Sequence, residues 1–174
     1  MTKMDRDSNE TESHASPGGG EFGFLHGAWR VRHRKLRHRL VGDGTWTEFG
    51  GTMTCRPILA GNGNFDENRL DDPDGAYQAC TVRLRDPATG RWSIFWIDGR
   101  RLRPDPPVTG SFHDGEGRFS GEDVHDGRSI LVRFTWSRLD SASPRWEQAF
   151  SADGGIGWET NWIMDFDRVA GTGG

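Results

Sequence analysis

Two places in the sequence combine residue types that could carry chemistry. The first is GNGNFDENRL, residues 61–70, which is unusually polar for a strand. Side chains alternate along an extended chain, so Phe65, Glu67 and Arg69 share one face. The other face carries Asn64, Asp66 and Asn68. One set must face an interior. If Phe65 does so, Glu67 lies inside too, either as a desolvated general acid or base or as an ion pair with Arg69.

The second place is the basic stretch WRVRHRKLRHRL, residues 29–40. Trp29 and Val31 share a face with His33, which makes His33 a second candidate for moving a proton inside the fold. Leu36 and Leu40 fall on the opposite face. We therefore expect a β-bulge near residues 34–35 that restores one apolar side.

Arginines alternate with the apolar residues of this stretch, and we expect them to form a solvated outer wall. The alternative is a phosphate- or nucleic-acid-binding stripe. No aromatic residue shares the face of Arg30, Arg32 and Arg34, so bases could not stack there. The whole chain carries a formal net charge of -4. We therefore expect no nucleic-acid partner.

Turn sequences recur at strand-length spacing along the chain, and its 25 Gly residues suit turns better than long helices. No segment shows a sustained helical period, although GEFGFLHG could form a short N-terminal helix. Ten strands are expected, near 28–40, 45–56, 62–69, 76–85, 91–98, 107–113, 117–124, 128–138, 144–151 and 157–168. Ten strands in hairpin sequence close most simply as a single all-β, up-and-down antiparallel barrel.

The last hairpin predicts which faces are buried. With its turn at ADGGIG, Phe150 would oppose Trp158, Gln148 would oppose Thr160 and Trp146 would oppose Trp162. This aromatic face would be inside, and a polar face that includes Asn161 would be outside. Two further inner faces follow from alternation: Ile130, Val132, Phe134, Trp136 on one strand and Trp92, Ile94, Trp96, Asp98 on another.

A barrel of ten strands is too wide to fill without large side chains, and the chain has eight Trp and ten Phe. Some rings should close the ends, and others should line a pocket with a few polar anchors. A fully plugged core is the alternative. The expected ligand-binding residues are Trp29, Asn64, Gln78, Trp96, Trp136, Trp146, Gln148, Thr160 and Trp162.

The two ends of the chain and its two cysteines indicate the bounds of the domain and the cellular compartment. Residues 1–20 are polar and should be disordered, residues 21–169 should form the barrel, and residues 170–174 should fray. Neither a secretory signal nor an apolar membrane span is present in the sequence. Cys55 and Cys80 are expected to be reduced thiols rather than a disulfide. We therefore expect a cytoplasmic protein with no membrane partner.

FGFLHGAWRV places a Gly-x-Trp pair at the first strand, which resembles the opening of calycin barrels, the lipocalin and fatty-acid-binding superfamily. The chain also resembles a bacterial family of domains of unknown function, whose members open with Gly-x-Trp-x-Val and close near RWEQAFSADGGIGWETNW. The matching stretches fall within residues 22–168. The resemblance implies a calycin-like barrel with an interior cavity, and no particular reaction. Gly23 departs from the family pattern, which often has Asp there.

Metal and cofactor signatures are weak. His33 and His38 fall on opposite faces of a strand, and no histidine pair has ligand spacing, so we expect no metal site. Neither a nucleophile elbow nor a phosphate-binding loop occurs. Some calycin barrels bind haem through one histidine, which leaves His33, His113 or His125 as an alternative to our expectation of no cofactor.

These observations predict a barrel that binds a small, partly apolar, aromatic or polyketide-like molecule in its lumen. The alternative is a cofactor-independent isomerase, cyclase or hydrolase that uses Glu67 or His33 as general acid or base. A third hypothesis is a partner-binding barrel that uses the basic strand. The sequence leaves a homodimer open.

Overall fold

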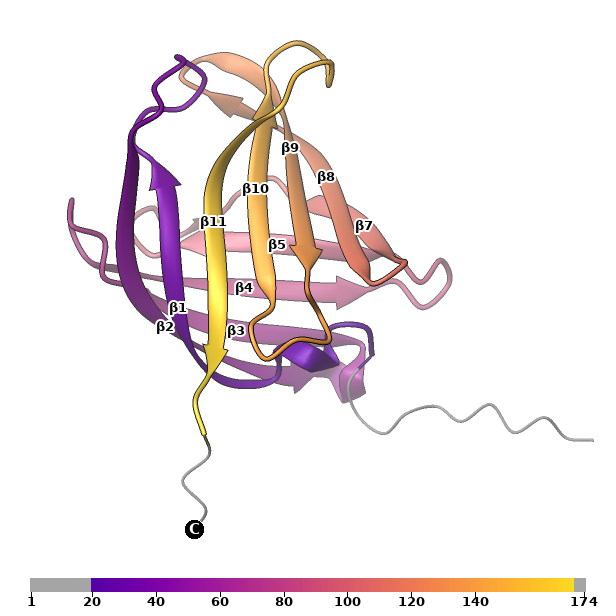
Figure 1. The fold of residues 1–174 in the computed structure, drawn as a ribbon. Coiled ribbons are helices and arrows are strands. Elements are labelled where there is room, and N and C mark those ends of the chain that lie inside the picture. The colour runs from indigo at the N-terminus through magenta and orange to yellow at the C-terminus, as the bar shows by residue number, and fades with distance from the viewer. Residues whose placement is uncertain (1–19, 171–174) are drawn as a thin grey trace, which may run out of the picture.

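Ten antiparallel strands close into an up-and-down barrel in the computed structural model, which describes residues 20–170 (Figure 1). Each long strand pairs with its neighbours in the chain, and β1 pairs with β11 to complete the circle. The barrel strands are β1 (Gly27–Leu36), β2 (Trp46–Ile58), β3 (Gly63–Leu70), β4 (Tyr77–Arg85), β5 (Trp92–Asp98), β7 (Val108–His113), β8 (Glu116–His125), β9 (Arg128–Ser137), β10 (Arg145–Ser151) and β11 (Glu159–Arg168).

Three short elements accompany the barrel. A two-residue strand, β6 (Arg103–Pro104), pairs with the end of β5. Two 3-10 turns, η1 (Gly23–Leu25) and η2 (Leu59–Gly61), precede β1 and β3. The expected all-β fold and the short N-terminal helical turn are confirmed. Residues 1–19 and 171–174, on which the expectations for the two chain ends fall, lie outside the described residues.

The first strand is shorter than expected, and it has no bulge. β1 ends at Leu36, and the chain then turns through Leu40 and Gly42, both with positive φ. The register between β1 and β2 is continuous from Gly27 opposite Cys55 to Leu36 opposite Trp46. The expected bulge is therefore wrong, because the inward position is held by a charged residue, Lys35, rather than by an apolar one.

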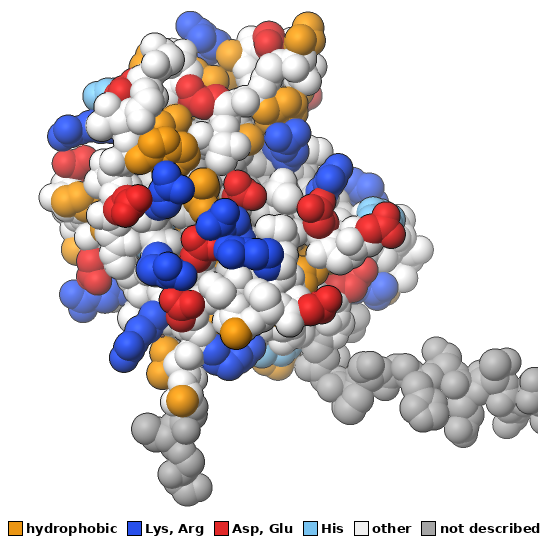
Figure 2. Space-filling model, viewed as in Figure 1, with side chains coloured by type: hydrophobic (Ala, Val, Ile, Leu, Met, Phe, Trp, Pro, Cys, Tyr) orange, Lys and Arg blue, Asp and Glu red, His pale blue; other side chains and the backbone are white. Residues whose placement is uncertain are grey.

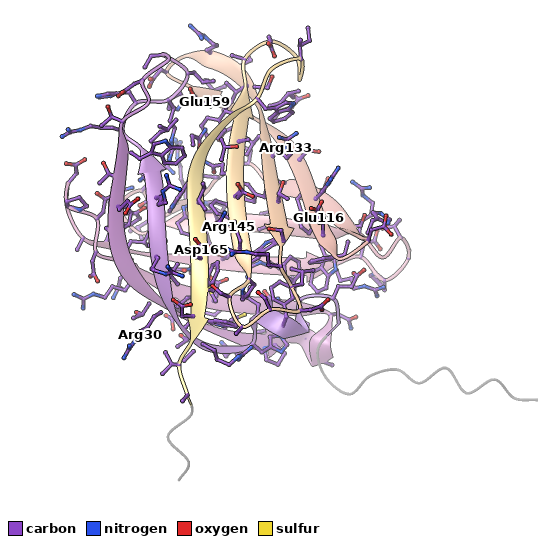
Figure 3. The ribbon with its side chains drawn as sticks, in the orientation of Figure 1. Arg30, Glu116, Arg133, Arg145, Glu159 and Asp165 are labelled. Carbon is purple, nitrogen blue, oxygen red and sulfur yellow. The ribbon has the colours of Figure 1, made fainter. Side chains whose placement is uncertain are left out.

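The outer wall of β1 carries Arg30, Arg32 and Arg34, as expected. Arg32 pairs with Asp167 and Arg34 pairs with Glu48. On the neighbouring strands β10 and β11, Arg145 and Asp165 lie side by side and form a two-bond ion pair (Figure 3). Basic and acidic side chains are interspersed over this face of the molecule (Figure 2).

The last hairpin contains a β-bulge that changes its register. Phe150 lies opposite Glu159 rather than Trp158, and Gln148 lies opposite Trp162 rather than Thr160. The register shifts between Gln148 and Ala149. The expected pairing is thus wrong throughout, since Trp146 faces Met164. The bulge also turns Asn161 into the protein, where it accepts a hydrogen bond from Gln148 Nε2 at 2.8 Å.

The alternation expected for β5 and β9 is confirmed. Ile94, Trp96 and Asp98 face the lumen from β5. The inward side chains of β9 are Ile130, Val132, Phe134 and Trp136.

One end of the barrel is closed by η1 and by aromatic packing. Phe22 is fully buried, with its ring edge-on to those of Trp92 and Phe112 at 4.9 and 4.7 Å. Trp29 donates its indole N–H to the Leu25 carbonyl oxygen at 2.7 Å. This Gly-x-Trp tryptophan is therefore part of the plug rather than of an open pocket.

Arg168, near the end of β11, ties the plug to the barrel. Its guanidinium donates to the carbonyl oxygens of Phe24 and His26, and it lies 4.1 Å from the Trp29 ring centroid. The end of β11 and the segment before β1 therefore meet at the closed end (Figure 1). The opposite end is formed by alternate connections, β1–β2, β3–β4, β5–β7, β8–β9 and β10–β11.

We expect Arg168→Ala to lower the free energy of unfolding by about 1–2 kcal/mol, because two backbone carbonyls lose a charged donor and Trp29 loses its cover. Urea denaturation measures the change. Arg32→Ala is the matched control, since it removes only an exposed ion pair with Asp167 and should cost less than about 1 kcal/mol. Equal losses in the two variants would contradict the proposed role of Arg168.

Candidate functional site

The open half of the barrel encloses a cavity of about 430 Å³. Its size is within the range typical of small-molecule sites. Large side chains from all around the barrel form its wall. The aromatic lining residues are Tyr77, Trp96, Phe134, Trp136, Trp146, Phe150, Trp162 and Phe166.

Three tryptophans form an aromatic cluster that reaches across the lumen, because Trp96 on β5 and Trp162 on β11 come from opposite sides of the barrel. The rings of Trp96 and Trp146 stand edge-on to Trp162, with centroids 5.7 and 5.5 Å away. Phe134 extends the cluster beyond Trp146 at 4.8 Å. Edge-to-face contacts of this kind fix ring orientations, so the wall is preorganised for a flat or apolar molecule.

The deeper part of the wall holds a buried polar cluster from β3 and β4. Arg83 forms an ion pair with Asp66, and its Nη1 also donates to Asn64 Oδ1 at 3.0 Å. Asn68 donates to the second carboxylate oxygen of Asp66. The arginine side chain is 6% exposed and the Asp66 side chain is fully buried. A charge pair in such surroundings needs these extra hydrogen bonds to offset desolvation.

Two buried donors near this cluster have no hydrogen-bond partner within residues 20–170. They are Arg83 Nε and the indole nitrogen of Trp136, and both residues belong to the cavity wall. The Arg83 guanidinium lies 5.9 Å from the centroid of the Trp136 ring and 5.2 Å from that of Phe22. The rings of Phe22 and Trp136 therefore pack against the Arg83 end of the polar cluster.

Charged residues also line the mouth of the cavity. Lys35 Nζ lies 4.9 Å from the centroid of the Trp162 ring and 3.5 Å from a carboxylate oxygen of Asp72. Arg100 forms a two-bond ion pair with Asp98 and stacks on Tyr77 at 3.6 Å. Burial raises the pKa of Tyr77 to about 12, so its hydroxyl keeps its proton.

His33 is buried beside the cavity but does not line it. Its ring stacks on Phe49 at 4.8 Å, and its Nδ1 accepts a hydrogen bond from the Trp162 indole at 3.3 Å. Burial, together with the charge of Lys35, lowers the pKa of His33 to about 4. The ring is therefore neutral near pH 7, and its accepting nitrogen is occupied by Trp162.

The structure separates the expected site residues into three groups. Five of them meet at the cavity wall: Trp96, Trp136, Trp146, Gln148 and Trp162. Three are buried without lining the cavity: Trp29, His33 and Asn64. The remaining three are not in the lumen: Glu67, Gln78 and Thr160.

Glu67 and Gln78 face the outside because the inner face of β3 is the polar one and the inner face of β4 begins with Tyr77 and ends with Arg83. Glu67 is exposed, and its two neighbours in the strand, Asp66 and Asn68, are buried. An interior Glu67 is thus a wrong expectation. It followed from Phe65, whose ring instead packs outside against the guanidinium of Arg56 at 5.3 Å. Thr160 is displaced by the bulge in β11.

Sequence reasoning missed the charged residues of the wall. Asp66 was named only as part of the alternative inner face of residues 61–70, and Arg83 and Lys35 were assigned no role, because each contradicts the usual rule that charges face water. A usable signal existed for Arg83, which alternates with Tyr77, Ala79 and Thr81 on one face of its strand. An arginine on an otherwise small or aromatic face indicates a buried partner.

The cysteines and histidines stand apart from the cavity chemistry. Cys55 and Cys80 are free thiols, as expected, and burial raises the pKa of Cys55 to about 12. His125 lies at the mouth near Phe150, and His113 contacts Ser111 on the surface. Among residues 20–170, no group of three or more His, Cys, Asp or Glu side chains could hold a metal ion.

No family model matches the chain, and no curated protein matches it. In the part of the chain that the structure describes, no helix has the length and apolar character needed to cross a membrane. The barrel and its cavity are therefore the observations from which function must be inferred.

Arg83→Met should lower the free energy of unfolding by about 3–5 kcal/mol, because it leaves the Asp66 carboxylate buried without its partner. Adding Asp66→Asn should restore part of the loss. Chemical denaturation of the single and double variants measures the coupling. Arg69→Met on the outer face of β3 is the control, with an expected change below about 1 kcal/mol. An additive double variant would contradict the coupling.

His33 should make the barrel sensitive to acid. Its folded pKa lies below the unfolded value of 6.5, so the unfolded state binds more protons between pH 6.5 and about 4. The contribution of His33 to the free energy of unfolding is therefore fully present above pH 6.5. As the pH falls toward 4 this contribution, about 3 kcal/mol, is lost. Urea unfolding across this range should show a shallower loss in His33→Gln. The exposed His38→Gln should behave like the parent, and identical profiles for all three proteins would refute the assignment.

Proposed function

We propose that the protein binds a small, largely aromatic molecule in the open half of its barrel. The observation that carries this proposal is the cavity of about 430 Å³, whose lining includes Trp96, Trp146 and Trp162. Preformed aromatic cavities with a few polar groups are typical of ligand sites. The resemblance to calycin barrels supports the same reading. Aromatic or polyketide-like molecules can pack against the ring faces and edges of this lining.

The polar groups would fix the orientation of the ligand. Gln148 lines the cavity and donates to Asn161, which leaves its carbonyl oxygen as an acceptor for a ligand. Asn68 and Asp66 lie opposite the apolar wall, deeper in the barrel. These groups provide directional contacts, while the rings provide contact area.

A catalytic role finds less support than binding. Glu67 is on the outer surface, and His33 is neutral and held by Trp162, so neither expected general acid or base reaches the cavity. Asp66 does line the cavity, but it is committed to Arg83 and Asn68. Reduced thiols at Cys55 and Cys80 suit the cytoplasm, which we propose as the site of action.

Binding of N-phenyl-1-naphthylamine, whose fluorescence rises in apolar surroundings, tests the proposal. Val132→Phe adds a ring inside the cavity and should weaken binding by about tenfold, since lost contact area of this size is worth ~1.4 kcal/mol. Leu131→Phe, on the outer face of the same strand, should leave binding unchanged.

Thermal unfolding of both variants checks that the barrel is intact. Equal binding by Val132→Phe and the parent would place the probe outside the lumen and defeat the proposal. Native mass spectrometry of protein purified without denaturation should in turn reveal a bound small molecule that is released on unfolding.

A further inference from the structure

We propose that the cavity selects aromatic molecules that carry an acidic group, such as a carboxylate or sulfonate, and that Lys35 and Arg39 hold this group at the mouth. The inference rests on the proposed ligand-binding function and specifies its ligand class. It follows from how the charges of the cavity wall are paired.

Most charged residues of the wall have partners of opposite sign. Arg83 pairs with Asp66, Arg100 with Asp98 and Arg101 with Asp105. Each pair is internally neutral, so it attracts no further charge. Such pairs define the shape and polarity of the wall.

Arg39 is the exception among the cations that line the cavity. Its guanidinium lies 5.3 Å from the centroid of the Phe150 ring, and no carboxylate within residues 20–170 forms an ion pair with it. The charge of the Glu159 carboxylate acts on Arg39 and opposes the lowering of its pKa by burial. That carboxylate accepts a hydrogen bond from the Leu40 backbone N–H instead of forming an ion pair with Arg39. Arg39 is half-buried, so its donors are partly withdrawn from water and open to a ligand.

Lys35 is a second cation that lines the same cavity. Its link to Asp72 is long, at 3.5 Å, and its ammonium lies near the rings of Trp162 and Tyr77. Burial and the charge of Arg39 both lower the pKa of Lys35, against the opposing effect of Asp72. Both cations line the same cavity, Lys35 beside Trp162 and Arg39 beside Phe150, so an anion bound there would be attracted by both.

Tyr77 adds a neutral donor between Lys35 and Arg100. Its hydroxyl keeps its proton, and its ring lies between the two cations, 5.8 Å from Lys35 Nζ and 3.6 Å from the Arg100 guanidinium carbon. An acidic group at the mouth would place its attached rings against Trp96 and Trp162. The remaining acid of the wall, Asp123, lies on β8, across the barrel from β1.

Two fluorescent probes of nearly the same shape test the charge requirement. 8-Anilinonaphthalene-1-sulfonate carries an acidic group, and N-phenyl-1-naphthylamine does not. The parent should bind the sulfonate more tightly. Arg39→Gln should weaken sulfonate binding by about fivefold to tenfold, the scale of a partly exposed charged contact, and leave the neutral probe unchanged.

Arg37→Gln is the matched control, because Arg37 is exposed in the same loop and does not line the cavity. Arg39→Lys should recover part of the sulfonate affinity. Near-ultraviolet circular dichroism verifies that every variant keeps the parent's aromatic packing.

The outcomes separate the two proposals. If the neutral probe binds and Val132→Phe blocks it, but the sulfonate has no advantage that depends on Arg39, the lumen is a binding site and the charge inference is wrong. If Arg37→Gln and Arg39→Gln weaken the sulfonate equally, the effect is general electrostatic attraction and the inference is also overturned. If neither probe enters the lumen, both proposals fail.

Discussion

Closure of ten antiparallel strands sets an interior width that most side chains cannot span. The chain meets this constraint differently at its two ends. At the closed end, Phe22 and Trp92 join the 3-10 turn in a solid aromatic plug. At the open end, Trp96 and Trp146 stand edge-on to Trp162, and the Trp96–Trp162 contact joins opposite sides of the barrel beside a remaining cavity. The cavity is thus a consequence of barrel width and of where the large rings are placed.

Charges enter this interior only in combinations that compensate for lost hydration. Asp66 is fully buried and is satisfied by Arg83 and Asn68. Lys35 has Asp72 and two aromatic faces around it. These arrangements give the lumen directional polar groups without leaving a free charge deep in the barrel. The unpaired positive charge instead lies at the mouth, where water and ligands can reach it.

Alternation and turn chemistry were sufficient to predict the strands, their order and the inner faces of β5 and β9. Ile130, Val132, Phe134 and Trp136 illustrate this, since four apolar residues of one parity leave little choice. Prediction failed where an inner face is polar. In β3 a buried ion pair outweighs the preference of Phe65 for the core, and this reverses the position of Glu67.

The last hairpin failed for a different reason. Its turn is one residue longer than expected, since Phe150 pairs with Glu159, and a bulge between Gln148 and Ala149 then shifts the register again and displaces Thr160 from the lumen. No residue type in RWEQAFSADGGIGWETNW identifies that bulge, because it is stabilised by the Gln148–Asn161 hydrogen bond, which forms only in the folded barrel. Local sequence therefore determines the strands, while partners far away in the chain determine parity and register.

The pairing of the first strand with the last has a consequence for synthesis of the chain. Trp29 lies opposite Arg168 and Lys35 lies opposite Trp162, so the barrel cannot close until β11 is complete. Until then β1 has an unpaired edge, and Trp29 lacks the arginine that covers it. Folding with contacts so far apart in the sequence is slow. Until β11 has been synthesised, the unpaired edge of β1 can form backbone hydrogen bonds with another chain. Pairing of the ten residues of β11 with β1 thus removes the exposed strand edge through which the chain could aggregate.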